Sequence, residues 1–137
     1  MSFDVDIFVD SDESVETFGQ QIEQIFGLKL ESDVTKVGLN PHSQVYYYVD
    51  PFEQYSFWIS QLEKGAYADE GTMLFSTYTY CFQIRVNAET KPEMLKRSIE
   101  LAHVIFDRLK VSGRYRLLAS ENLDRKLDQY DPPETNK

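Results

Sequence analysis

The stretch FDVDIFVDSDESVETFGQQIEQIFG, residues 3–27, contains two hydrophobic periods in succession. Its first part, Phe3–Val9, alternates apolar residues with mostly acidic ones, which predicts a strand with one buried face. Its second part, Asp12–Phe26, spaces apolar residues three or four positions apart, which predicts a helix with one apolar face. Residues 10–12 supply N-cap side chains, and Gly27 suits a helix end. The chain therefore opens with a strand and a helix packed on it.

The same two patterns predict the elements of the remaining chain. Four β-prone runs bounded by turn residues predict strands at Val45–Asp50, Tyr55–Leu62, Met73–Val86 and Arg114–Ala119. A long helix enters at Thr90–Glu93 and ends at Ser112–Gly113. A short charged helix is predicted from Ser120 to Tyr130, and residues 28–40 offer one or two short strands.

Short connections between successive elements favour antiparallel pairing. We therefore expect an α+β two-layer sandwich, with a mostly antiparallel sheet of five or six strands, two long helices on one face and a short C-terminal helix. The opening strand–helix–strand is compatible with one parallel unit. Residues 1–130 are predicted to form a single domain, and residues 131–137 a disordered tail.

Composition limits the class of protein. The 137 residues are 42% hydrophobic, which is enough for a packed core, and no apolar run approaches the 18 residues of a membrane span. The acidic start is unlike a signal peptide, and the single Cys81 cannot form an internal disulfide. We therefore expect a cytoplasmic location. His42, His103 and Cys81 are far apart in the sequence, so we expect no metal site and no cofactor.

Charge is distributed unevenly along the chain. Residues 1–90 carry 15 Asp and Glu against 4 Lys and Arg, whereas residues 91–137 carry 8 against 10, for a net charge of −9. This balance disfavours binding to nucleic acid or to an anionic bilayer, and it favours a basic protein partner. We expect neither a membrane nor a small-molecule substrate among its partners.

The segment Ile7–Asp12, IFVDSD, resembles the first motif of haloacid-dehalogenase-type phosphatases. The resemblance implies Asp10 as nucleophile and Asp12 as acid/base, both near Mg²⁺. The rest of that family's pattern does not follow, since the segment YADEG at residues 67–71 lacks the later Gly-Asp pair. The simpler interpretation is that both carboxylates cap and start the helix.

The region from Val45 to Glu70 combines aromatic and acidic residues. If Val45, Tyr47 and Val49 face the core, the alternate residues of this strand face outwards. Tyrosine and tryptophan offer broad contact area, and neighbouring carboxylates can pair with Lys or Arg of a partner. The predicted partner-binding residues are Tyr46, Tyr48, Asp50, Glu53, Tyr55, Trp58, Tyr67, Asp69 and Glu70.

These features together resemble the small acidic immunity proteins of bacterial polymorphic toxin systems, including contact-dependent growth inhibition. The features are the acidic balance, the opening strand and amphipathic helix, the aromatic strands and the absence of catalytic motifs. The resemblance implies a tight cytoplasmic complex that neutralises a cognate basic toxin domain, commonly a nuclease, by covering its active site or substrate surface. It implies no catalytic activity of the chain itself. Two alternatives stay open: an acidic type III secretion chaperone that binds an effector segment, and a small Mg²⁺-dependent phosphatase built on Asp10 and Asp12.

Overall fold

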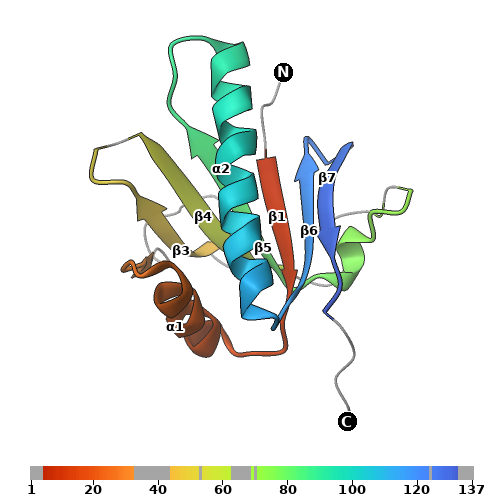
Figure 1. Ribbon diagram of the computed structural model, residues 1–137. Helices are drawn as coiled ribbons and strands as arrows, with labels where there is room; N and C mark the ends of the chain where they lie inside the picture. The colour runs from red at the N-terminus through yellow and green to blue at the C-terminus, as the bar shows by residue number, and fades with distance from the viewer. Residues whose placement is uncertain are drawn as a thin grey trace.

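The computed structural model describes residues 5–32, 44–52, 54–62, 69, 71–123 and 125–132. In chain order its elements are β1 (Val5–Asp10), α1 (Val15–Phe26), β2 (Glu31–Ser32), β3 (Gln44–Val49), β4 (Tyr55–Gln61), the 3₁₀ turn η1 (Phe75–Thr77), β5 (Tyr80–Val86), α2 (Lys91–Ser112), β6 (Arg116–Glu121) and β7 (Arg125–Tyr130). Figure 1 shows them as one twisted sheet with both helices in front of it. The predicted α+β class is confirmed.

The described strands form one antiparallel sheet in the order β2-β3-β4-β5-β1-β6-β7. Six of them have six or seven residues, and β2 has only two. The first strand, β1, lies in the middle between β5 and β6, so that Ile7 is opposite Phe82 on one side and Ala119 on the other. The parallel opening unit is therefore wrong, because β1 pairs antiparallel with strands from the second half of the chain.

Both helices pack on the same face of the sheet. Phe18 and Ile22 of α1 and Phe106 and Leu109 of α2 join one core cluster with the inward side chains of the strands. Ser14 caps α1 by accepting a hydrogen bond from Thr17 N at 3.2 Å. Among the described residues, no helix combines the length and the apolar character that a membrane crossing requires.

The opposite face of the sheet is partly covered by the segment that precedes β5. Met73, Phe75 and Tyr78 form a second core cluster with Phe8 and Leu118. This corrects the predicted strand Met73–Val86, because the strand that forms here is Tyr80–Val86 and Phe75–Thr77 forms a 3₁₀ turn. The apolar residues of 73–78 bury themselves on the far side of the sheet rather than extending the strand.

The predicted C-terminal helix is wrong, since residues 125–130 form strand β7 paired with β6. The turn between these strands has positive φ at Asn122 and Leu123, as a tight hairpin requires. A register shift in the pairing, between Ala119 and Ser120, marks a β-bulge. The bulge lets Leu127 and Tyr130 both pack against the core although they lie three positions apart. The same spacing is typical of a helix, which is why the sequence predicted one here.

Candidate functional site

The connection between β1 and α1 forms the site at one edge of the helix layer. β1 ends at Asp10, and Ser14 is the N-cap of α1, so residues 11–13 make the turn. Ser11 Oγ accepts a hydrogen bond from Glu13 N at 3.0 Å, and Ser11 N donates to Thr79 Oγ1 at 2.9 Å. These bonds fix the backbone of the turn against the start of β5.

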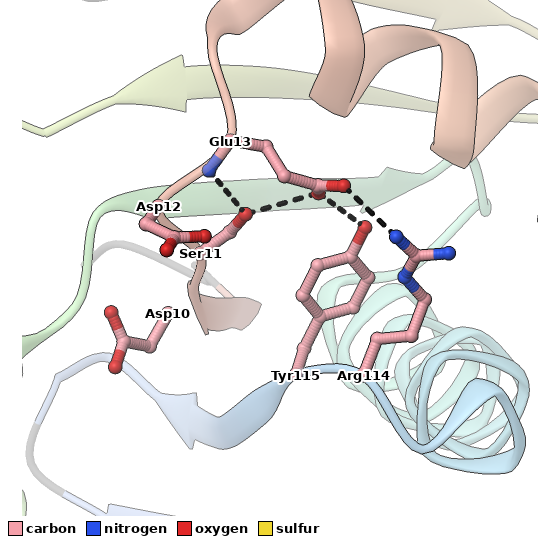
Figure 2. Close-up of a pocket in the computed structure, with 6 residues that line it drawn as sticks. All are labelled: Asp10, Ser11, Asp12, Glu13, Arg114 and Tyr115. Atoms are coloured by element: carbon pink, nitrogen blue, oxygen red, sulfur yellow. Dashed lines mark hydrogen bonds and ion pairs between the residues drawn. The ribbon is translucent and has the colours of Figure 1, made fainter. Parts of the chain in front are cut away.

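Glu13 is the centre of a hydrogen-bonded network that joins three parts of the chain. Tyr115 donates to its Oε1 at 2.7 Å, Ser11 Oγ donates to the same oxygen at 3.0 Å, and Arg114 pairs with its Oε2 at 3.2 Å. Figure 2 shows Tyr115 and Arg114 pointing toward Glu13 from the segment that follows α2. Tyr80 adds a hydrogen bond to the backbone carbonyl of Glu13 at 2.8 Å. The Glu13 side chain is only 15% exposed, so its charge stabilises the turn and is little available to a partner.

The tyrosines around Glu13 keep their protons. Burial raises the pKa of Tyr115, and the hydrogen bond to the Glu13 carboxylate and its charge raise that pKa further. Burial also raises the pKa of Tyr80, with a smaller contribution from the charge of Glu13. Both hydroxyls are therefore donors at neutral pH, and the network stays intact there.

Asp10 is held by a second network on the other side of the turn. Arg116 Nη2 pairs with Asp10 Oδ2 at 3.3 Å and donates to the carbonyl oxygen of Thr77 at 2.9 Å. The Arg116 guanidinium lies over the Tyr78 ring, 4.1 Å from its centroid. Arg116 therefore links the end of β1 to the segment that covers the opposite sheet face.

A hollow of about 380 Å³ opens between these two networks, lined by Asp10, Ser11, Asp12, Glu13, Arg114 and Tyr115. Asp12 is one of its lining residues (Figure 2), and Glu16 follows in the first turn of α1. Both are exposed, and within the described part of the chain neither carboxylate has a hydrogen-bond or ion-pair partner. We call Asp10, Asp12, Glu13 and Glu16 the acidic corner. Residues 10–26 contain five acids and no base, so the negative potential continues along α1.

The chemistry of this corner is that of an electrostatic contact. Among the described residues, no three His, Cys, Asp or Glu side chains gather as a metal site would require. Asp10 and Asp12 do line the same hollow, as the phosphatase alternative needs. However, Asp10 is paired with Arg116, which makes its carboxylate a weaker nucleophile. Asp12 and Glu16 are the carboxylates of this corner that have no partner in the described part of the chain, and they can therefore meet a cation.

Tyr46 and Tyr48 of β3 were predicted to face outwards, but both are partly buried and pack against the core beneath the helices. Tyr46 donates to the carbonyl oxygen of Val15 at 3.2 Å, and a Cβ at Gly19 would lie 2.5 Å from its ring. Gly19 is therefore the position that lets α1 lie on this tyrosine. Tyr55 also packs on this face, with its ring centroid 5.9 Å from that of Tyr48.

The other predicted residues are distributed over different parts of the molecule. Trp58 is paired with Tyr47 and Gln83 and therefore belongs to the opposite face of the sheet from Phe57. Asp50 accepts hydrogen bonds from Phe52 N and Gln54 N in the β3–β4 turn. Asp69 accepts from Ser76 N at 2.8 Å. Glu53, Tyr67 and Glu70 lie outside the described residues. The described members of the predicted set do not form one patch.

The sequence singled out Asp10 and Asp12 but not the residues that hold the acidic corner in place, which are Arg114, Tyr115 and Arg116. Tyr115 and Glu13 are 102 positions apart, and Asp10 and Arg116 are 106 apart, so no local pattern links them. The available signal was the acidic run from Asp10 to Glu16, which contains no base.

Comparison of the chain with protein-family models, with curated proteins and with solved structures found no match. The functional argument therefore rests on the geometry and charge of the acidic corner.

Proposed function

We propose that this chain is an immunity-type binding protein that neutralises a basic toxin domain, a nuclease, in the cytoplasm. Its acidic corner docks on the basic surface with which the toxin holds its substrate. The observation that carries the proposal is the pair of exposed carboxylates, Asp12 and Glu16, which have no counter-ion among the described residues and lie at a hydrogen-bonded turn.

Preorganisation supports a binding role. The Glu13 network holds the backbone on which Asp12 stands, and the Ser14 cap holds the first turn of α1 with Glu16. A surface that is already ordered loses little conformational entropy when it binds. The Glu13 carboxylate therefore has a structural role, and the carboxylates of Asp12 and Glu16 are the ones that can contact a partner.

Charge complementarity supports a basic partner. A nuclease holds phosphates with Lys and Arg, and such a surface attracts a protein that carries a net charge of −9. Opposite potentials raise the association rate, while shape and packing set the lifetime of the complex. Carboxylates placed against those cations exclude the phosphates, so inhibition is competitive with nucleic acid.

Paired capture experiments test the proposal. Tagged wild-type protein and the variant Asp12→Lys/Glu16→Lys are incubated with lysate from the source organism, and retained proteins are identified by mass spectrometry. We expect a protein with a basic domain to be retained by the wild type and lost with the variant. The same domain, purified, is then assayed for nucleic-acid cleavage with increasing amounts of inhibitor. A partner that is retained equally by both forms, or that keeps full activity in the complex, contradicts the proposal.

The phosphatase alternative rests on the shared hollow of Asp10 and Asp12. Its test is hydrolysis of phosphoesters with Mg²⁺, compared between the wild type and Asp10→Asn. If the wild type hydrolyses phosphoesters and Asp10→Asn abolishes that activity, the phosphatase alternative replaces the binding proposal. An inactive wild type counts against the phosphatase alternative.

The chaperone alternative predicts a different mode of binding. A chaperone of that type holds an extended effector segment along a dimer, whereas the proposed immunity complex buries a folded domain. Limited proteolysis of the captured partner, free and in the complex, distinguishes the two. A folded toxin domain resists cleavage in both states, whereas an extended effector segment resists cleavage only when it is bound.

A further inference from the structure

Helix α2 exposes two large apolar side chains on its outer surface. Val104 is 57% exposed and Val111 is 86% exposed. They are seven residues apart, which is two helical turns, so they lie on one side of the helix. Between them stand Asp107 and Arg108, both exposed. Neither valine contributes to the core that holds α2 on the sheet.

A groove adjoins this side of α2. A cavity of about 440 Å³ lies between the C-terminal turns of the two helices and is lined by Ile25, Asp107, Arg108, Val111 and Ser112. The Arg108 guanidinium lies 5.8 Å from the centroid of the Phe26 ring, at the end of α1. The groove therefore has an apolar wall formed by Ile25 and Val111, and charged groups at its margin.

The charge of α2 is opposite in sign to that of the whole chain. The helix carries five Lys and Arg against three Asp and Glu, whereas the whole chain has a net charge of −9. Two copies of an acidic protein repel each other least where their own surface is not acidic. Helix α2 offers one such surface.

We infer that a second copy of this chain docks on this side of α2, in an antiparallel pair whose two-fold axis passes between Asp107 and Arg108. In this arrangement residues equally far from the axis face each other. Val104 then meets the second copy's Val111 beside the groove, and Asp107 meets the second copy's Arg108. Each contact occurs twice, so both apolar side chains and both central charges find a complementary partner.

Self-complementarity is what selects a second copy over another occupant. An antiparallel pair matches valine with valine and acid with base from a single sequence, over the two turns between Val104 and Val111. The contact is small compared with the roughly 800 Å² per partner of a standard interface. We therefore expect a weak dimer, with a Kd on the order of 100 µM.

Sedimentation equilibrium of the whole chain from about 10 µM to 1 mM tests the inference. It is run at physiological salt, where the repulsion of the net charges is screened. We expect the wild type to pass from monomer to dimer, and Val111→Glu to raise the Kd at least about tenfold, since it desolvates a charge in the contact. Circular dichroism verifies that the variant is folded, which an exposed position allows.

A charge swap supplies the specific control. Asp107→Arg places arginine opposite the second copy's Arg108 and should weaken the dimer, as should Arg108→Asp. The double variant Asp107→Arg/Arg108→Asp restores both pairs and should recover the wild-type Kd. A wild type that stays monomeric at 1 mM, a dimer that Val111→Glu leaves unchanged, or a double variant no better than the single ones would overturn the inference. Capture of the basic partner by the acidic corner is independent of each of these outcomes.

Discussion

Tyr115 donates its hydroxyl to Glu13 Oε1 over 2.7 Å, across 102 positions of sequence. The bond ties the turn before α1 to the segment after α2, and it is the shortest of the contacts to this carboxylate. The bond therefore helps to hold the acidic corner in one position.

Replacing Tyr115 by phenylalanine should reduce stability with little change in shape. A hydrogen bond to a charged group contributes about 1.5–3 kcal/mol, and among the described residues the partly buried carboxylate of Glu13 would keep Ser11 and Arg114 as partners. Urea unfolding of Tyr115→Phe measures the loss. Tyr130→Phe is the matched control, because no hydrogen bond to the Tyr130 hydroxyl occurs among the described residues, and it should cost less than about 0.5 kcal/mol. Equal losses of stability in the two variants would contradict a stabilising role for the hydrogen bond between Tyr115 and Glu13.

Alkaline pH should destabilise the protein through the same bond. The pKa of Tyr115 is raised in the folded state by burial and by Glu13, so the folded protein holds this proton more tightly than the unfolded chain does. Stability is fully present below the unfolded pKa of about 10 and falls as pH rises above it. Unfolding free energies between pH 8 and 11 measure this slope. Tyr115→Phe should show a shallower decline, and an identical slope would contradict the assignment.

The effect of Gly19→Ala on the free energy of unfolding should change sign with the residue at position 46. A helix gains about 1 kcal/mol from alanine in place of glycine. Here the added Cβ would lie 2.5 Å from the Tyr46 ring, and overpacking of this kind costs about 1–3 kcal/mol. We expect Gly19→Ala to destabilise the wild type and to stabilise Tyr46→Val, where the ring is absent. Thermal or urea unfolding of the four proteins completes this double-mutant cycle. Stabilisation in both backgrounds would mean that α1 does not rest on Tyr46.

The elements that the sequence predicted well are those whose period is unambiguous. The predicted segments Phe3–Val9 and Asp12–Phe26 overlap β1 and α1, although residues 3 and 4 lie outside the described residues and α1 begins at Val15. The helix that enters at Thr90 corresponds to α2. The orientation of β3 was not predictable in this way, because VYYYV offers a bulky side chain at every position and either face could be buried. Tertiary packing decided it, since Gly19 leaves room on α1 for the Tyr46 ring.

The candidate site was less predictable than the fold. Its acids are visible as a run without bases, but the prediction that residues 10–12 cap and start the helix is wrong, because Asp10 ends β1 and the N-cap of α1 is Ser14. The cations and hydroxyls that arrange them come from Arg114, Tyr115 and Arg116, which β6 brings beside β1. Strand pairing over such separations depends on the whole topology. No local pattern therefore separates Asp12, which is exposed, from Glu13, which is partly buried and hydrogen-bonded.

The association rate of the captured basic domain, measured by stopped flow at several salt concentrations, tests the central claim most directly. Asp12→Lys/Glu16→Lys should slow association about 10-fold or more at low salt and flatten its salt dependence, because the steering charges lie at the acidic corner. Glu89→Lys/Glu93→Lys makes the same change in net charge at the start of α2, where both acids are exposed, and should have a much smaller effect. If both double variants slow association equally, net charge alone steers the partner and the acidic corner is not its docking surface.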